Sequence, residues 1–463
     1  MPKCSPGQPD CVDEPLDKTA CAEANGFLNQ TNVATVINLQ NEPLNILVKY
    51  TDLLGVEQGS IKAKLNSKLK RDFIVNNLGL APDTYGTVCV ETDAKKNGAW
   101  IGGVAAYKPA NDSHFDFVLY YPFTNPKTGI QTFSMNTFTL GGSLVANWIR
   151  LTDAVRDGKP LLGTIQYFAE NGQFVKDVKV NILDAGRYDF GGHEVVPNDL
   201  QEFESVFLAR FVPENPNQKF YQTVSRYFYN CPDPLLPAGC LNFLSAFVLP
   251  DRPPLADRVV GNVSVTDATF SVIEIINPLK FDGKVLVEAF NSSGTQMSSL
   301  VVDVPHFGSR HLIVNDWLNS GSGYAVVTPL STMAKSSAFV SVSSLTYKLF
   351  DDGQLSYGYA SPFTKLSNEP GQVSQFNTFL AQDNVLEFNN DTNVKQKVVV
   401  TVLDYFGNNL DELFVTLKPH ATVRQRLNVL PDTYGTLVID GQDLLFRNFV
   451  TKQNEYVIPY RSQ

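Results

Sequence analysis

One short segment of the chain gathers the side chains that acid–base or metal chemistry needs. Residues 184–196 read DAGRYDFGGHEVV and hold two aspartates, one histidine and one glutamate within about a dozen positions. Carboxylates beside an imidazole can bind a metal ion or move a proton between acid and base. The candidate residues are Asp184, Asp189, His193 and Glu194. A polar Gly-Gly loop explains the same residues without chemistry, so an enzyme with its site here is the second alternative.

The rest of the sequence contains no recognisable catalytic or metal-binding motif. It lacks the nucleophile elbow, the glycine-rich phosphate loops and the paired histidines of metalloproteases. The histidines are scattered along the chain, and a glycine-containing turn separates the two nearest ones, His306 and His311. We therefore predict no catalytic residue, no metal and no cofactor.

Six cysteines indicate where the protein works. Cys231 and Cys240 bracket a proline-rich loop, NCPDPLLPAGC, and we expect them to pair with each other. We expect Cys89 to pair with a cysteine of the N-terminal arm, where spacing alone does not choose among Cys4, Cys11 and Cys21. Disulfides persist in oxidising compartments, which predicts an extracellular or cell-surface protein. A periplasmic or outer-membrane lipoprotein, acylated at Cys4, is the alternative.

The charge of the chain excludes one class of partner. A net charge of −10 and an isoelectric point near 5.1 leave no basic stripe for a phosphate backbone, so we expect no nucleic-acid binding. The one basic cluster, residues 62–71 (KAKLNSKLKR), is typical of an edge strand whose lysines prevent pairing with other chains. No run of about 18–20 apolar residues occurs, so no transmembrane segment is expected.

The sequence repeats itself in a way that indicates an ancestral tandem duplication. The hexapeptide PDTYGT occurs at 82–87 and again at 431–436. Tyr107-Lys108 and Tyr347-Lys348 are each followed fifteen residues later by Pro-Phe-Thr, and Asn136-Thr137-Phe138 returns as Asn377-Thr378-Phe379. The last two echoes, of Tyr-Lys and of Asn-Thr-Phe, are shifted by 240 and 241 residues, which predicts two homologous halves.

Each half contains two units with the same strand pattern. Alternating apolar runs end in turns closed by glycine at Gly55, Gly172, Gly294 and Gly407. Period-two alternation with β-branched and aromatic residues is typical of strands, and short strands at this spacing favour β-sandwiches. We predict an all-β protein with an N-terminal arm (1–25) and four antiparallel sandwiches in two homologous pairs, at 26–124, 125–250, 251–364 and 365–463. Only residues 198–210 could begin a helix; an edge-strand insertion is equally consistent with them.

Two recurring residue types remain. A basic residue precedes or opens a strand in every unit, at Arg71, Arg187, Arg310 and Arg424, and we interpret it as structural. Aromatic residues lie at the ends of the first and third units: Tyr120, Tyr121, Tyr357 and Tyr359. They could form a platform for sugar rings, but packing between sandwiches is the favoured interpretation. Pro122 and Pro362 then stiffen the connections, which predicts a semi-rigid rod.

The order of strand, Asp/Asn-Gly turn, Tyr-Gly step and return strand, clearest at residues 398–440, resembles tandem Ig-like β-sandwich repeats of bacterial secreted and surface proteins. That resemblance implies a passive extracellular module used for reach, adhesion or assembly, and it transfers no catalytic residue. We therefore expect a non-catalytic structural or adhesive protein of the bacterial cell surface or of an appendage. Its expected partners are proteins or further copies of the chain. A carbohydrate-binding surface protein that recognises glycans is the first alternative.

Overall fold

The protein is described by a computed structural model that covers residues 16–111, 114–136, 143–192, 206–230, 242–250, 254–265, 269–318, 321–330, 340–351, 353–366, 371–452 and 456–461. Its regular structure in these ranges is β-strand, with short 3-10 turns that include η1 (Phe27–Asn29), η2 (Val75–Leu78), η6 (Val314–Asp316) and η7 (Phe379–Ala381). The prediction of an all-β chain is confirmed. The last part of the segment that could have begun a helix lies in a strand, which starts at Val206.

The strands form eight four-stranded sheets, two for every eight consecutive strands. Within each set of eight, the first, sixth, third and fourth strands form one sheet, here called the outer sheet. The fifth, second, seventh and eighth strands form the other, here called the inner sheet. All four sets have this same order, so the strand order does not single out two pairs. The arrangement in two homologous pairs stays a prediction.

The first two sandwiches show the pattern. The first has the outer sheet β1 (Thr19–Asn25), β6 (Tyr85–Thr92), β3 (Leu44–Asp52) and β4 (Glu57–Leu65), and the inner sheet β5 (Lys70–Ile74), β2 (Thr31–Asn38), β7 (Trp100–Asn111) and β8 (His114–Pro122). The second has the outer sheet β9 (Gln131–Asn136), β14 (Val206–Pro213), β11 (Leu161–Phe168) and β12 (Phe174–Ile182), and the inner sheet β13 (Arg187–Gly191), β10 (Ser143–Asp153), β15 (Phe220–Asn230) and β16 (Asn242–Leu249).

The third and fourth sandwiches repeat it. The third has the outer sheet β17 (Val259–Val265), β22 (Gly321–Pro329), β19 (Gly283–Asn291) and β20 (Gln296–Val304), and the inner sheet β21 (Ser309–Ile313), β18 (Thr269–Ile276), β23 (Ser341–Leu349) and β24 (Leu355–Pro362). The fourth has the outer sheet β25 (Gln372–Asn377), β30 (Tyr434–Asp440), β27 (Gln396–Asp404) and β28 (Asn409–Leu417), and the inner sheet β29 (Thr422–Arg426), β26 (Asp383–Asn390), β31 (Leu444–Lys452) and β32 (Tyr456–Arg461).

The first strand lies within the range that the sequence assigned to the arm. Residues 19–25 (TACAEAN) pair with β6 along their whole length. Their alanines are too small to show an apolar alternation, which is why the segment had no visible strand pattern. The four sets of strands span residues 19–122, 131–249, 259–362 and 372–461. The finer domain boundaries given above stay a prediction.

Each sandwich is held by an apolar core between its two sheets. In the first, alternate residues of β3 and β7 are buried in one cluster that draws on both sheets, including Val48 and Val104. Alternation of this kind is expected where one face of a strand packs and the other does not. Inner strands depart from it, since seven of the eight residues of β2 are at least partly buried. The inner sheets are therefore covered on both faces.

A seven-residue signature lies in the second strand of every sandwich, which is the first strand of the inner sheet in chain order. It consists of a small amide or hydroxyl residue, a polar middle residue three positions on, and Asn or Asp three positions after that. The four copies are Asn32–Asn38, Asn147–Asp153, Ser271–Asn277 and Asn384–Asn390. The first residue ties the two sheets together, because its side chain donates to the carbonyl at the end of the first strand, as Asn32 does to Asn25 at 2.7 Å. The last residue binds the backbone of neighbouring turns, as Asn277 Nδ2 does at Phe281 and Val304.

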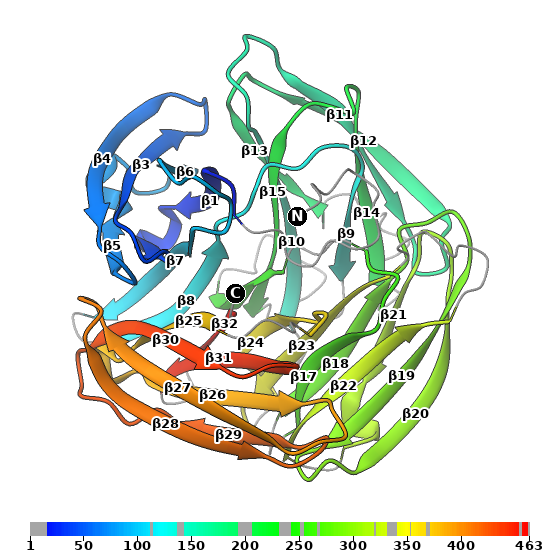
Figure 1. The fold of residues 1–463 in the computed structure, drawn as a ribbon. Helices are drawn as coiled ribbons and strands as arrows, with labels where there is room; N and C mark the ends of the chain where they lie inside the picture. Colours follow the sequence, from blue (N-terminus) through cyan, green and yellow to red (C-terminus); the bar gives the residue numbers. More distant parts are fainter. Residues whose placement is uncertain are drawn as a thin grey trace.

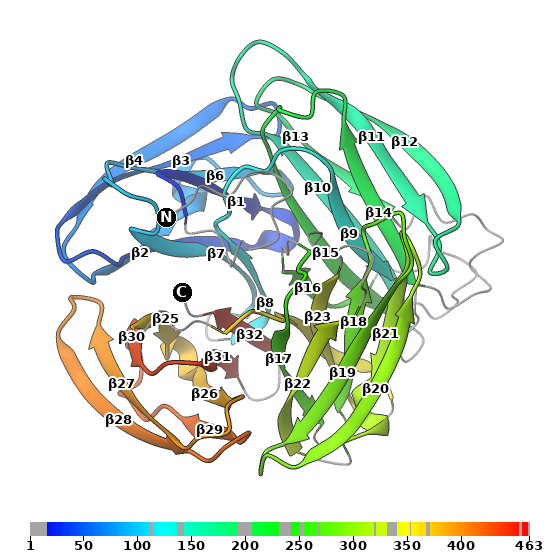
Figure 2. The same ribbon diagram turned by 45° about the vertical axis from the view of Figure 1, so that its right-hand side comes forward.

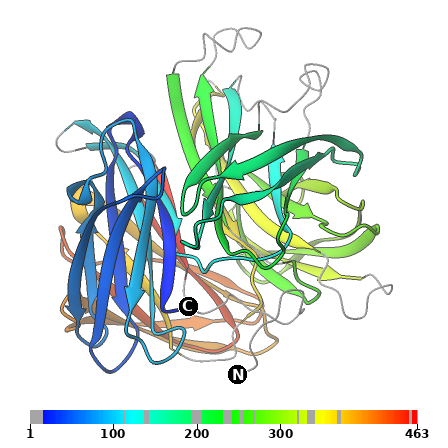
Figure 3. The same ribbon diagram turned by 90° about the horizontal axis from the view of Figure 1, so that it is seen from above.

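The four sandwiches close into a circuit. Their last strands contact one another in turn, β8 with β16, β16 with β24, β24 with β32, and β32 with β8. These strands meet near the centre of the molecule, and the outer sheets lie at its periphery (Figures 1 and 2). The view from above shows the first and second sandwiches side by side, with the other two behind them (Figure 3). The prediction of a semi-rigid rod is therefore wrong. The inner sheets carry a second packing face, and this face draws the sandwiches together.

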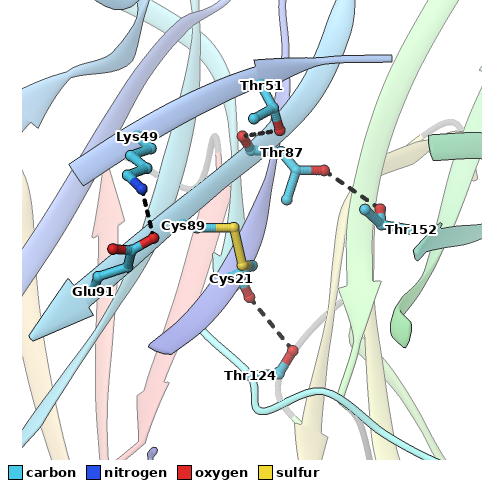
Figure 4. Close-up of a disulfide and its surroundings, with 8 residues drawn as sticks. All are labelled: Cys21, Lys49, Thr51, Thr87, Cys89, Glu91, Thr124 and Thr152. Carbon is cyan, nitrogen blue, oxygen red and sulfur yellow. Dashed lines mark hydrogen bonds and ion pairs between the residues drawn. A yellow bond between two sulfur atoms is a disulfide. The ribbon is translucent and has the colours of Figure 1, made fainter. Parts of the chain in front are cut away.

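One disulfide joins the first and sixth strands. Cys21 and Cys89 lie directly opposite each other in β1 and β6, with an S–S distance of 1.99 Å (Figure 4). This confirms the prediction that Cys89 pairs with a cysteine of the N-terminal segment. The backbone of Cys21 also exchanges two hydrogen bonds with Thr124, which follows the last strand of the sandwich. Cys4, Cys11, Cys231 and Cys240 lie outside the described residues.

Candidate functional site

The middle residue of the signature is a buried polar group, and in the second and third sandwiches it reaches across to the preceding sandwich. Its neighbours on the strand point into the core, as Ile149 and Leu151 do, so the middle residue lies on the opposite face. The four middle residues are Thr35, Arg150, Glu274 and Glu387, and all are buried. Each contacts the residue opposite it on the fifth strand: Thr35 Oγ1 donates to Asp72 Oδ1 (2.6 Å), Arg150 Nε donates to Asp189 Oδ2 (2.9 Å), His311 Nε2 lies 2.8 Å from Glu274 Oε2, and Arg424 Nε donates to Glu387 Oε2 (2.5 Å).

The first and second sandwiches meet at a buried group of four charges. Arg150 Nη1 donates to Glu23 Oε2 of β1 at 2.9 Å, and Arg187 Nη2 reaches the same oxygen at 3.4 Å. Arg187 Nε also donates to Asp189 Oδ1 at 2.8 Å. Burial would raise the pKa of Asp189, but the charges of Arg187 and Arg150 hold it below its ordinary value. Two arginines and two carboxylates thus neutralise one another across this contact.

The second and third sandwiches meet at a smaller buried centre. Arg226 of β15 is fully buried, and its Nη2 donates to Glu274 Oε2 of β18 at 2.8 Å. Glu274 accepts this bond while it pairs with His311 of its own sandwich. Burial would raise the pKa of Glu274, but the charge of Arg226 and the hydrogen bond from His311 lower it to about 2. Glu274 is therefore ionised at neutral pH despite its burial.

The remaining two contacts combine ions with aromatic rings. Between the third and fourth sandwiches, Arg258 forms a two-pronged ion pair with Asp391, and the imidazole of His420 stacks on Phe290 with ring centroids 5.5 Å apart. Between the fourth and first, the Lys70 ammonium lies 4.9 Å from the centre of the Tyr434 ring. Val373 packs there against Ile37 and Ile101. These contacts close the circuit between the ends of the chain.

The polar segment singled out by its composition does not form one site among the described residues. Asp184 accepts the backbone N–H groups of Asp157 and Gly158, at 3.0 and 3.1 Å, and so holds a loop. Asp189 belongs to the arginine cluster described above. His193 and Glu194 lie outside the described residues. The two aspartates therefore serve different structural contacts.

The aromatic residues at the ends of the units lie in contacts between sandwiches. Tyr121 is 1% exposed, and its hydroxyl accepts a hydrogen bond from Arg150 at 3.2 Å. Tyr357 and Tyr359 pack against Phe449 of the fourth sandwich. Tyr120 accepts a hydrogen bond from Gln375, also of the fourth sandwich, at 3.3 Å. These four rings are thus not an open platform for sugars.

The recurring arginines lie within the fifth strands but at three different positions. Arg71 and Arg310 lie opposite the core residues Val36 and Ile275, Arg187 lies opposite Thr152, and Arg424 lies opposite Glu387. They are therefore not a fourfold ligand clamp. The basic cluster at 62–71 does not form one structural feature. Its first part belongs to the edge strand β4, whereas Lys70 is buried.

A small hollow of about 50 Å³ lies where the first three sandwiches meet. Six serine and threonine residues are among those that line it: Thr124, Thr132, Ser134, Thr223, Ser341 and Ser343. Glu274 lies on the same wall. Within the described ranges, no group of three or more His, Cys, Asp or Glu side chains is placed to hold a metal ion. Those ranges also hold no helix with the length and apolarity that a bilayer span requires.

The buried charges can be recognised in the sequence by their position in the signature. Neither the composition of the chain nor the comparison of identical repeats revealed them. In each of β10, β18 and β26 the residue at the centre of the signature is charged and lies between apolar neighbours, as in SVIEIIN. A charge at such a place must be paired when the strand is buried on both faces. The middle residue varies among Thr, Arg and Glu, so a search for identical repeats does not find it.

No family model and no curated protein matches the chain. Among solved structures, it shares 7% identity and a TM-score of 0.12 with a protein described as a β-galactosidase from Bacteroides fragilis, covering 52% of this chain and 34% of that one. A β-glucuronidase from Bacteroides uniformis shares 10% identity and a TM-score of 0.11, covering 53% and 28%. An α-L-rhamnosidase from Streptomyces avermitilis shares 7% identity and a TM-score of 0.12, covering 89% and 55%. The chain spans about a third of the length of the first two enzymes, and likenesses this weak carry no argument about its fold or activity.

Proposed function

We propose that the chain is a non-catalytic structural or adhesive protein that works outside the cytoplasm, on a bacterial cell surface or in a surface appendage. The observation that carries the proposal is the use of its buried charges. Arg150, Arg226, Glu274 and Glu387 each bind an opposite charge at or beside a contact between sandwiches. Buried ion pairs of this kind fix one geometry, since removing one partner leaves an uncompensated charge. A stiff body of four sandwiches suits mechanical support better than turnover.

The exposed edges of the sandwiches support a role in binding other proteins. The strands β4, β12, β20 and β28 are each the last strand of an outer sheet. Edge strands present backbone groups to which another strand can add. They also expose large apolar side chains, among them Phe174 (51%) on β12 and Phe414 (74%) on β28. Self-assembly or docking on a protein partner would cover these side chains.

We expect Phe414→Lys to reduce self-association. In sedimentation experiments across a concentration series, the unaltered protein should form species larger than its 51.2 kDa monomer, and the variant should remain monomeric. A charge on an exposed edge opposes strand addition. Leu430→Lys is the matched control, because Leu430 is equally exposed (75%) but precedes β30. A monomeric unaltered protein at every concentration contradicts assembly through this edge.

The location can be tested through the disulfide. The cells that make the protein are quenched with acid, alkylated and digested, and the peptides that contain Cys21 and Cys89 are measured by mass spectrometry. We expect a disulfide-linked pair, because thiols are kept reduced in the cytosol and oxidised outside it. The same digest shows whether Cys4 carries a lipid. Free, alkylated Cys21 and Cys89 would contradict an extracytoplasmic location.

A further inference from the structure

Neighbouring sandwiches are joined by a repeated backbone contact. The third and fourth strands of each outer sheet are linked by a turn that contains one of the recurring glycines, Gly55, Gly172, Gly294 and Gly407. The carbonyl two residues before the glycine accepts a hydrogen bond from the first residue of the fifth strand of the next sandwich. Leu53 accepts from Arg187 at 2.9 Å, Glu170 from Ser309 at 3.2 Å, and Ser292 from Thr422 at 3.1 Å. The sandwiches are therefore joined head to tail.

The tyrosine of the repeated hexapeptide PDTYGT belongs to the same contact. Between the first and second sandwiches, the Arg187 guanidinium lies 4.8 Å from the centre of the Tyr85 ring. Between the fourth and first, the Lys70 ammonium lies 4.9 Å from the centre of the Tyr434 ring. Arg187 and Lys70 are each the first residue of a fifth strand. The contact that closes the circuit is thus built like the contact between the first two sandwiches.

The backbone part of the closing contact is incomplete. Among the described residues, no hydrogen bond joins the N–H group of Lys70 to the carbonyl of Tyr405, which lies two residues before the fourth glycine. The turn also lies further from its neighbour. A Cβ added at Gly55 would lie 2.5 Å from a backbone oxygen of the second sandwich, whereas one added at Gly407 would lie 3.4 Å from a backbone oxygen of the first.

The closing contact also differs in its charges. The other three contacts contain the ion pairs Arg150–Glu23, Arg226–Glu274 and Arg258–Asp391. No ion pair joins the fourth to the first sandwich within the ranges that the structure describes, where Gln375 donates a neutral hydrogen bond to the Tyr120 hydroxyl at 3.3 Å. Lys70 is 3% exposed, and its ion-pair partner Asp72 is 4.0 Å away. A buried ammonium with so distant a counterion opposes closure.

The two surfaces of the closing contact can separate without unfolding either sandwich. The first three contacts join sandwiches that are consecutive along the chain, whereas the fourth and first sandwiches are not consecutive. The apolar core clusters of these two sandwiches share no residue. A head-to-tail contact of this kind can close a ring within one molecule or link one molecule to the next.

We propose that the contact between the fourth and first sandwiches is exchangeable: the circuit opens there, and the fourth sandwich of one copy docks on the first sandwich of a second copy. In dilute solution the contact within one chain prevails, because the chain holds its two surfaces at an effective concentration of roughly millimolar order. This inference rests on the self-assembly proposed above, and it names a surface for it other than the edge strand β28.

The test uses two variants, each of which loses one of the two surfaces. Val373→Lys alters the fourth sandwich and Ile101→Lys the first; the two side chains pack together at this contact and lie outside the core clusters of their sandwiches. Both variants also carry Phe414→Lys, which removes association through β28. Alone, each should be an open monomer with a larger radius of gyration than the unaltered protein. An equimolar mixture retains one intact pair of surfaces and should sediment as a 1:1 dimer, at twice the monomer mass of 51.2 kDa.

The chain that carries both Val373→Lys and Ile101→Lys is the matched control, because it offers neither surface and should stay monomeric in every mixture. Circular dichroism shows whether each variant is folded; Tyr434→Lys and Ile37→Lys replace a variant of the fourth or first sandwich that is not. A mixture that remains monomeric across the concentration series, or a dimer that forms equally with the double variant, would overturn the proposal. Association of the unaltered protein through Phe414 would then still stand, so the two proposals fail separately.

Discussion

Replacing Arg226 by methionine is expected to lower the free energy of unfolding by about 3–5 kcal/mol at neutral pH. The reason is the isolation of Glu274, which would stay buried beside His311 without the balancing charge of Arg226. The measurement is urea denaturation followed by tryptophan fluorescence, with Trp148 in the second sandwich and Trp317 in the third as reporters. The matched control is Arg426→Met, since Arg426 pairs with Asp383 at the surface and such pairs contribute at most about 1 kcal/mol.

The pH dependence of the same experiment tests the cause. The folded-state pKa of Glu274 is lowered to about 2 from an ordinary value of 4.5. The group therefore contributes stability that is fully present above pH 4.5 and is lost as the pH falls toward 2. In Arg226→Met the loss of stability at low pH should be smaller. In that variant the charge of Glu274 is no longer paired with Arg226, so protonation of Glu274 removes an unpaired buried charge. Equal stability losses for Arg226→Met and Arg426→Met, with unchanged acid profiles, would contradict the role of the buried pair.

Removing the disulfide by Cys21→Ala and Cys89→Ala together should lower the stability of the first sandwich by about 4 kcal/mol. The bond closes a segment with a sequence separation of 68, and the loop-entropy relation gives a value of this order. Because β1 also supplies Glu23 to the contact with the second sandwich, its loosening should spread to that contact. Denaturation with and without a reductant, read from Trp100 fluorescence, measures the effect. Identical curves for the unaltered protein and the double variant would contradict it.

The outer sheets were the predictable part of the fold. Strands such as β3 alternate strictly, because one face meets the core and the other meets water, so their sequence carries a clear period of two. The inner strands are buried on both faces and lose that period, as in TFSVIEII of β18. The strand β1 was missed for another reason, since its small residues pack without a large apolar alternation. Its cysteine nevertheless pointed to the correct partner.

The contacts between sandwiches could not be derived from identity among the repeats. The first and last residues of the signature keep a small polar side chain in all four sandwiches. They bind backbone groups and therefore need amide, hydroxyl or carboxylate side chains. The middle residue of the signature changes with the partner: Thr35 lies beside Asp72, whereas Glu274 faces His311 and Arg226. Composition suggested Asp184, Asp189, His193 and Glu194 as one cluster because they are close in sequence. The structure instead assigns Asp184 to a turn and Asp189 to a contact with the first sandwich.

The central claim is that the four sandwiches form a closed circuit, and small-angle X-ray scattering of the dilute monomer tests it most directly. A compact chain of 463 residues has a radius of gyration of about 23 Å. The closed circuit predicts a radius close to this value and a symmetric distribution of interatomic distances. A clearly larger radius with the long-tailed distribution of an elongated particle would show four sandwiches strung end to end and would contradict the account.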